Sequence, residues 1–310
     1  MMRLTIIGFG NQAKSWALNL KDSGFPVRVA LRSNSASIQS VIEQGLEVIE
    51  IGSRNFYSDS VYALLTPDSH HHEFLAENAQ QLPLGTSILY AHGFSVQKYK
   101  LEKLYPHLNH VLFAPKSIGS ELRKQYELGG NLGAVYSLEY FHGPSFEMEN
   151  WLKNMAVALG ISMGPYKTTF KNETQADLYS EQGLLCSLIP YTAGKMFEHL
   201  IENGVEAELA YFECWHELKL IVNAMVDKGP LAFFDLISPN ALIGAEKGYN
   251  RLFKPEFNNN LQSLMNEIED GTFSSELDAA NVMETRRKIR EYWMNSPLQK
   301  TFEKINQDLK

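Results

Sequence analysis

The chain has 310 residues, of which 44% are hydrophobic and 21% charged, so its size fits two domains and its composition is ordinary for a folded globular protein. No apolar run reaches the roughly 18 residues that a membrane-spanning helix needs, and the formal net charge of −8 argues against nucleic acid as a general partner. The apolar segment Leu4–Ile7 is too short for an export signal and two cysteines cannot form a disulfide framework, so we expect a cytoplasmic protein.

The first half of the chain alternates short apolar runs with helical patterns. Helices are predicted at Asn11–Asp22, His70–Gln81 and Ser145–Leu159. Between them lie runs rich in Val, Ile, Leu and Tyr that are bounded by Gly, Pro or Asn, and these predict strands. Such alternation is typical of a doubly wound α/β domain with a parallel sheet covered on both faces. The predicted strands are Arg3–Ile7, Val27–Leu31, Val61–Leu65, Ser87–Ala91, His110–Ala114 and Leu132–Ser137.

The pattern changes near Gly164-Pro165, and long amphipathic stretches follow from Phe170 onward. They predict an all-helical second domain, so we expect one domain over residues 1–163 and another over 164–310. The charged end, Gln299–Lys310, is expected to be mobile or loosely helical. The predicted helices of the second domain are Thr174–Leu188, Tyr191–Glu202, Ala207–Val226, Asn258–Glu269 and Ala279–Met294.

A dinucleotide fingerprint joins the first predicted strand to the first predicted helix. It reads Gly8-Phe9-Gly10-Asn11-Gln12-Ala13, with alanine in the place of the third glycine. Gly8 permits the tight turn, and Gly10 lets the backbone approach a pyrophosphate at the helix N-terminus. A glycine-rich turn needed only for packing is the alternative, but the position at the start of an α/β pattern favours a bound dinucleotide.

The end of the second predicted strand indicates which dinucleotide is bound. An NAD site usually carries Asp or Glu here, whereas this chain has Arg32, Ser33 and Ser35. A cation flanked by hydroxyl groups suits a 2′-phosphate, because charge-assisted bonds to phosphate favour arginine. We therefore predict NADPH, the alternative being that Arg32 is only a surface residue.

Two pairs of carboxylates at helical spacing are the main chemical feature of the second half. Asp177 and Glu181 form one pair, and Glu213 and Glu217 form the other. Residues four apart share a helix face, and the neighbours of Glu213 are apolar nearly all round, which predicts a buried pair that needs a cation or a shared proton. Four carboxylates on two helices could bind two Mg²⁺ ions. Surface acidic pairs are common, so these residues alone leave a metal site and a solvated face equally open.

Several ordered segments together resemble short-form ketol-acid reductoisomerase along nearly the whole chain, more loosely after about Tyr249. The resemblance implies an NADPH-binding domain, a helical domain of knotted topology, and a homodimer or higher homo-oligomer. It also implies a reaction of branched-chain amino-acid biosynthesis, in which the alkyl group of 2-acetolactate or 2-aceto-2-hydroxybutanoate migrates and NADPH reduces the product. The segments are Gly8–Leu20, Leu65-Thr66-Pro67-Asp68, Ala91-His92-Gly93-Phe94, Ala114-Pro115-Lys116, Thr168 through Gln182, Ala210–Val222 and Ile237-Ser238.

The resemblance also implies roles for individual residues. Asp177 and Glu181 would bind two Mg²⁺ ions, with Asp177 between them, and Glu213 and Glu217 would complete the site from the partner subunit. Lys116, His92 and Glu173 would be active-site residues, with His92 near the nicotinamide, and Ser238 would contact the substrate carboxylate. The cofactor site would include Gly8, Gly10, Gln12, Ala13, Thr66 and Pro67 beside the three residues that follow the second strand.

Some positions keep a plainer interpretation or depart from the family pattern. Ser238 alone is typical of a turn, and His70-His71-His72 resembles a metal tract but better fits the start of a helix beside the cofactor. The segments Ser117–Ser120 and Ala241–Lys254 diverge from the family. Because no proposed catalytic group is missing, we expect an active enzyme. The alternatives are a relative that acts on another 2-hydroxy-3-keto acid and a non-catalytic NADPH-binding protein.

Overall fold

A computed structural model describes residues 2–308, and the chain divides into two compact units, Met1–Thr174 and Gln175–Lys310. Met1, Leu309 and Lys310 lie outside the described residues, and with them the end of the predicted mobile tail. The predicted domain boundary after residue 163 stays a proposal. It coincides with the start of strand β8 (Met163–Lys167), which belongs to the sheet of the first unit.

The first unit is built on one eight-stranded sheet with the order β3-β2-β1-β4-β5-β6-β7-β8. All six predicted strands are present, because each is an apolar run that the sheet buries. The sheet also contains two strands that the sequence did not predict. Its other strands are β1 (Leu4–Ile7), β2 (Val27–Leu31), β3 (Val48–Glu50), β4 (Val61–Leu64), β5 (Ser87–Tyr90), β6 (Asn109–Pro115) and β7 (Gly133–Tyr140).

Both unpredicted strands lie at the edges of the sheet. β3 has only three residues, and β8 contains Pro165 and is largely exposed, so neither shows a long apolar run. Prediction of a wholly parallel sheet is wrong at one pair, since β7 runs antiparallel to β6. Helix α6 (Gly119–Leu128) packs on α1 (Asn11–Asp22), and the left-handed turn at Gly129 brings the chain back to β7.

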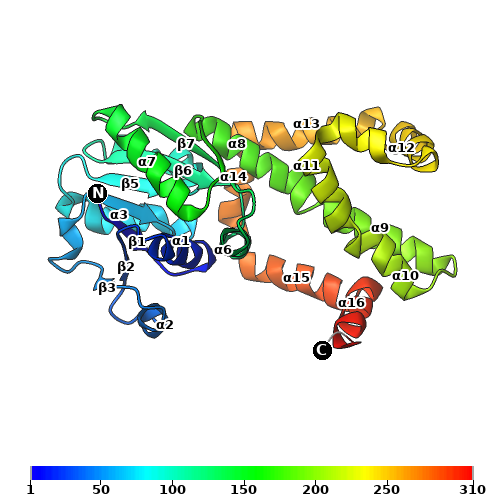
Figure 1. Ribbon diagram of the computed structural model, residues 1–310. Helices are drawn as coiled ribbons and strands as arrows, with labels where there is room; N and C mark the ends of the chain where they lie inside the picture. Colours follow the sequence, from blue (N-terminus) through cyan, green and yellow to red (C-terminus); the bar gives the residue numbers. More distant parts are fainter. Residues whose placement is uncertain (1, 309–310) are drawn as a thin grey trace. The chain divides into compact units, whose positions relative to one another are not determined.

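Helices cover both faces of this sheet (Figure 1), as the alternating pattern predicts. One buried cluster joins α1 and α7 (Ser145–Leu159) to the strands, with Trp16 and Trp151 among its residues. The other joins the strands to α3 (His71–Asn78), α4 (Phe94–Tyr99) and α5 (Leu101–Leu104). The predicted helices Asn11–Asp22 and Ser145–Leu159 are confirmed at both ends, whereas the α-helix within predicted His70–Gln81 is α3, His71–Asn78. Helix α2 spans Ile38–Glu43.

The five strands β2, β1, β4, β5 and β6 are parallel to one another. Their carboxyl ends therefore lie at one edge of the sheet, where ligands bind in open α/β folds. The segments that follow these strands carry Gly8, Arg32, Thr66, His92 and Lys116. The fold thus brings the predicted cofactor loops and two predicted active-site residues to a single edge.

The second unit is entirely helical in its described residues, as predicted. Helix α8 (Phe170–Ser180) crosses from the first unit into it. Of the two alternatives expected for the tail, mobile or loosely helical, the structure shows a helix, α16 (Pro297–Asp308), which packs against α9 and α10. The remaining elements are two π-helical turns, η4 (Glu181–Leu185) and η5 (Phe212–His216), with α9 (Leu188–Glu202), α10 (Ala207–Tyr211), α11 (Leu218–Leu236), α12 (Pro239–Leu252), α13 (Pro255–Asp270), α14 (Thr272–Ala279) and α15 (Val282–Asn295).

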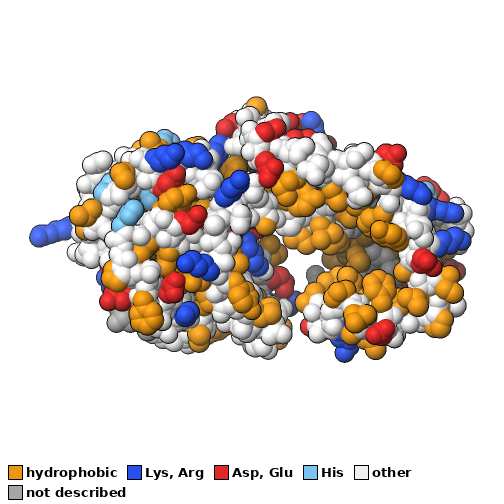
Figure 2. Space-filling view, turned by 90° about the horizontal axis from the view of Figure 1, so that it is seen from above, with side chains coloured by type: hydrophobic (Ala, Val, Ile, Leu, Met, Phe, Trp, Pro, Cys, Tyr) orange, Lys and Arg blue, Asp and Glu red, His pale blue; other side chains and the backbone are white. Residues whose placement is uncertain are grey.

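The core of the helical unit is small, and many of its apolar side chains are exposed. Phe197, Tyr211 and Leu298 belong to its buried cluster. Helix α11 is largely apolar in sequence, yet none of its residues is buried in the part of the chain that the structure describes. Figure 2 shows hydrophobic side chains gathered on the surface of this unit. No helix among the described residues is long and apolar enough to cross a membrane.

Candidate active site at the carboxyl edge of the sheet

The turn after β1 has the geometry of an anion-binding fingerprint. Gly8 has a φ of 97°, and a Cβ placed there would lie 3.1 Å from Thr66 Cγ2. Gly10 caps the N-terminus of α1, and no atom lies within 4 Å of where its Cβ would be. Backbone amides at this helix start can therefore meet a pyrophosphate directly. Ala13 is buried in the helix–sheet contact, as its place in the fingerprint requires.

Two further observations fit a nucleotide at this turn. Thr66 Oγ1 is buried and has no hydrogen-bond partner among the described residues, so a polar cofactor group can use it. In addition, α6 begins directly against the fingerprint, because a Cβ on Gly119 would lie 2.7 Å from the Gln12 amide nitrogen. Only glycine permits this approach. The divergent segment Ser117–Ser120 therefore keeps the residue that its packing needs.

The loop after β2 presents the predicted phosphate ligands. Arg32 and Ser33 are exposed, and the Ser35 amide donates a 3.0 Å hydrogen bond to the Arg32 carbonyl. Ser35 Oγ accepts a hydrogen bond from the Ser37 amide at 3.3 Å. The loop is thus a closed turn whose arginine side chain and Ser33 hydroxyl reach solvent, an arrangement compatible with a 2′-phosphate.

Glu173 is the centre of the best-defined polar cluster at this edge. Glu173 is only 3% exposed. Its carboxylate accepts hydrogen bonds from Lys116 Nζ at 2.6 Å and from the Gly93 amide at 2.7 Å. His92 Nδ1 lies 3.0 Å from Glu173 Oε2. Three groups from the loops after β5 and β6 therefore meet one buried carboxylate on α8, and the fold brings His92, Lys116 and Glu173 together.

The charge state of Glu173 follows from its partners. Burial alone would raise the pKa of this carboxyl group, but the hydrogen bond and charge of His92 and the ammonium of Lys116 outweigh burial and lower the pKa below 4.5. Glu173 is therefore ionised at neutral pH.

The position of α8 is fixed at its first turn by residues of the first unit. The Phe170 amide donates a 2.6 Å hydrogen bond to Glu139 Oε2, and the Asn172 amide donates to Thr169 Oγ1 at 3.0 Å. Ser137, which is fully buried, donates to the same Glu139 carboxylate. A carboxylate here satisfies an otherwise unpaired helix amide and complements the helix dipole. Glu139 thus helps to set where Glu173 lies one turn later.

The first predicted acidic pair continues along the same helix. Asp177 follows Glu173 by one turn of α8, so the two share a face. Glu181 begins the π-helical turn η4. A π-helical turn is rare and often occurs at functional sites. The second pair shows the same feature, because Glu213 lies within the π-helical turn η5 and Glu217 ends it.

The burial expected for the second pair is wrong in the single chain. Glu213 and Glu217 are both exposed, whereas Tyr211 and Cys214 on the same stretch are buried in the core of the helical unit, so the two carboxylates lie on the side of the helix that no other described segment covers. No three of the four predicted metal-binding carboxylates come within 4.8 Å of one another in the described part of the chain. One described chain therefore does not gather all four into a single site.

The structure shows a local structural role for two other residues or segments that the sequence singled out, Ser238 and the histidine tract. Ser238 caps the N-terminus of α12 and its Oγ accepts from the Ala241 amide at 3.2 Å, so its predicted substrate contact stays a prediction. The histidine tract does begin a helix, at α3, and only His71 is buried. Sequence reasoning missed the Gly93 amide and Glu139, since backbone donors and distant caps leave no motif.

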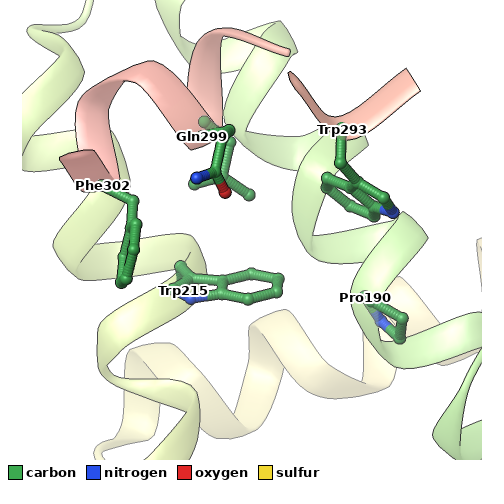
Figure 3. A pocket seen from close by; sticks show the side chains of 6 residues that line it. Pro190, Trp215, Trp293, Gln299 and Phe302 are labelled. Carbon is green, nitrogen blue, oxygen red and sulfur yellow. The ribbon is translucent and has the colours of Figure 1, made fainter. Parts of the chain in front are cut away.

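A separate cavity lies within the helical unit. It has a volume of about 320 Å³ and is lined by Pro190, Trp215, Trp293, Leu298, Gln299 and Phe302. Figure 3 shows Gln299 and Trp215 facing each other across it, with Phe302 and Trp293 at the sides. None of these six residues is titratable, so this cavity supplies no acid, base or metal ligand.

Comparison with known proteins relates the chain to one enzyme family. Residues 2–165 match the NADPH-binding domain of acetohydroxy acid isomeroreductase, and residues 170–310 match the C-terminal domain of ketol-acid reductoisomerase. The structure is similar to that of an NADH-preferring ketol-acid reductoisomerase from an uncultured archean, at 28% identity and a TM-score of 0.82, covering 99% of this chain and 94% of that one.

More distant structures share only the fold. A semialdehyde dehydrogenase NAD-binding protein from Cupriavidus necator has 17% identity and a TM-score of 0.63, covering 87% of this chain and 99% of its own. A pyrroline-5-carboxylate reductase from Coxiella burnetii has 14% identity and a TM-score of 0.63, covering 87% and 98%. Such likeness at low identity extends to the architecture and no further.

Proposed function

Because the chain belongs to the ketol-acid reductoisomerase family and is an oxidoreductase of that family with an NADPH-binding domain, we propose that it converts 2-acetolactate or 2-aceto-2-hydroxybutanoate into the 2,3-dihydroxy acid. The observation that carries this proposal is the buried Glu173 carboxylate, which holds Lys116, His92 and the Gly93 amide together. The reaction would take place in the cytoplasm, in keeping with two free cysteines among the described residues.

Residues of this chain would stabilise negative charge on the substrate and orient the groups around it. Lys116 donates one N–H to Glu173, and the positive charge of its ammonium group can stabilise negative charge that develops on a substrate oxygen. The contact between His92 Nδ1 and Glu173 fixes the imidazole ring. Bound Mg²⁺ would polarise the substrate oxygens, and NADPH would supply the hydride.

The donor set fits magnesium. The ligands would be Asp177 and Glu181 from α8 and η4, which offer only carboxylate oxygens, the atoms that hard divalent cations prefer. Glu173, whose two oxygens accept from Lys116, His92 and Gly93, would hold these three groups beside the ions. Two ions need further oxygens, so the second carboxylate pair would come from another copy of the chain.

A homodimer would explain both the exposed carboxylates and the exposed apolar helices. Val226, Leu231 and Ile243 on α11 and α12 are 73%, 79% and 66% exposed, more apolar surface than a lone helical unit usually leaves in water. A second copy would cover this surface and bring Glu213 and Glu217 to the other chain's Asp177 and Glu181. Larger assemblies built from such dimers are compatible with this proposal.

Mixing two inactive variants tests the shared site. Asp177→Asn and Glu217→Gln would each abolish turnover alone, because every site in either homodimer lacks a ligand. Co-expression would restore about a quarter of wild-type activity, since about half of the dimers are mixed and each mixed dimer has one intact site. Activity is measured as NADPH oxidation on the purified mixture. Mixtures as inactive as the single variants would contradict a site shared between copies.

Arg32 tests the preference for NADPH. Replacement of Arg32 by Asp removes a charge-assisted bond to the 2′-phosphate and adds repulsion, so we expect KM for NADPH to rise about 10- to 100-fold. KM for NADH, which has no 2′-phosphate, should stay the same or fall. Steady-state kinetics with both cofactors measures this. Equal sensitivity of the two KM values would show that Arg32 does not contact the 2′-phosphate.

The proposed function itself is tested by turnover. NADPH oxidation, followed by absorbance with racemic 2-acetolactate, should require Mg²⁺. Failure with 2-acetolactate but turnover of a bulkier 2-hydroxy-3-keto acid would favour a divergent relative. Binding of NADPH without turnover of any such acid would favour a non-catalytic protein.

A further inference from the structure

The middle histidine of the tract His70-His71-His72 has no part in the function described so far, yet it is the one that the fold buries. His71 is 3% exposed, whereas His70 and His72 are exposed on the first turn of α3 and the turn before it. Desolvation lowers the pKa of His71. A buried imidazole is costly unless both ring nitrogens have partners, so its contacts show what it does.

Both ring nitrogens of His71 bind to segments at the carboxyl edge of the sheet. Nε2 lies 2.9 Å from the Thr66 carbonyl oxygen, and Nδ1 lies 2.7 Å from Ser95 Oγ. A carbonyl oxygen only accepts, so Nε2 is the donor. In the neutral ring Nδ1 then accepts the hydroxyl proton of Ser95, which is itself fully buried. One ring therefore joins the loop after β4 to the first turn of α4.

Each of the two segments leads to a part of the active site. Thr66 faces the fingerprint, since its Cγ2 would touch a Cβ on Gly8, and the family relation places the cofactor there. Ser95 lies three residues after His92, and the ring of Phe94 between them stacks on His92 at 6.1 Å. His92 and Gly93 are in turn bound by Glu173. A continuous line of contacts thus runs from the cofactor turn through His71 to the catalytic carboxylate.

We propose that His71 is a positioning residue, whose neutral imidazole sets the spacing between the cofactor loop at Thr66 and the segment His92–Ser95. Shifts of about an ångström between reacting groups can reduce an enzyme rate up to about 100-fold, so this spacing matters for hydride transfer. The proposal rests on the proposed function of the site, but its effect on cofactor binding does not require turnover.

Variants of the tract separate positioning from mere packing. His71→Leu fills the space without either hydrogen bond, and we expect NADPH to bind about tenfold more weakly and kcat to fall about tenfold or more. His71→Gln can donate to Thr66 and accept from Ser95, so it should recover most of both losses. The matched controls His70→Gln and His72→Gln, one residue away on the exposed side, should behave as wild type.

A second variant tests the two ends of the ring separately. Ser95→Ala removes only the bond toward His92, so kcat should fall while the Kd for NADPH stays unchanged. NADPH binding is measured by cofactor fluorescence, kcat by absorbance and folding by Tm. A His71→Leu protein with wild-type Kd and kcat and only a lower Tm would overturn the proposal, as would a His71→Gln protein no better than His71→Leu. A wild-type chain that binds NADPH without turnover refutes the function instead.

Discussion

Replacement of Glu173 by Gln is expected to lower kcat about 100- to 10,000-fold while NADPH still binds. Glutamine keeps the size of the side chain and can accept from the Gly93 amide, but it removes the charge that holds Lys116 at 2.6 Å and His92 at 3.0 Å. The Lys116 ammonium group and the His92 ring would then lose the charged acceptor that binds them both. The loss should appear in kcat more than in KM for NADPH, as measured by NADPH oxidation.

Glu77→Gln, an exposed change on α3, is the matched control and should leave kcat unchanged. A Glu173→Gln enzyme whose kcat is within about threefold of the wild-type value would show that the carboxylate is structural only.

The pH dependence of folding stability gives a second test of Glu173. Because the folded pKa of Glu173 is lowered below 4.5, its ionised form stabilises the fold above that pH. The free energy of unfolding of wild type should therefore fall toward that of Glu173→Gln as the pH drops below about 4.5.

Replacement of Asp177 by Asn is expected to abolish Mg²⁺-dependent turnover, with a loss of about 1,000-fold or more. The change is nearly isosteric and removes one negative charge from the proposed metal site on α8. NADPH binding should persist, because the fingerprint is at the start of the chain and depends on Gly8 and Gly10 rather than on Asp177. Calorimetric titration of the NADPH-bound protein with Mg²⁺ should show weakened metal binding.

The comparison variant is Glu256→Gln, which removes a charge from the exposed start of α13. It should bind Mg²⁺ and turn over as wild type does. If Asp177→Asn kept more than about a tenth of the Mg²⁺-dependent rate, Asp177 would not be a metal ligand. If wild type itself turned over fully after removal of divalent cations, the two-ion proposal would fail altogether.

Local patterns predicted the parts of this protein that local physics decides. The fingerprint at Gly8 and Gly10 needs a particular backbone, and buried strands such as Val61–Leu64 need apolar residues. β8 escaped prediction because its residues are mostly exposed and include Pro165. The charged end from Gln299 was expected to be mobile or loosely helical, and it forms helix α16, in which Leu298 and Ile305 pack against the neighbouring helices despite the charged surface.

The active-site cluster could be predicted only in part. His92, Lys116 and Glu173 were identified through family resemblance, and alternation of strands and helices placed the first two at one sheet edge. Their convergence on a single carboxylate depends on residues 57 and 81 positions apart, which no local pattern reports. Burial of Glu213 was predicted wrongly for a related reason, since apolar neighbours along a helix do not show whether another segment covers them.

The identity of the product tests the central claim most directly. Incubation of 2-acetolactate carrying ¹³C in the methyl group on C2 with NADPH and Mg²⁺, followed by NMR, reports where the methyl group ends. An isomeroreductase yields 2,3-dihydroxy-3-methylbutanoate, in which the labelled methyl group is attached to C3. If the product were 2,3-dihydroxy-2-methylbutanoate, with the label still on C2, the enzyme would be a simple ketone reductase and the account would be wrong.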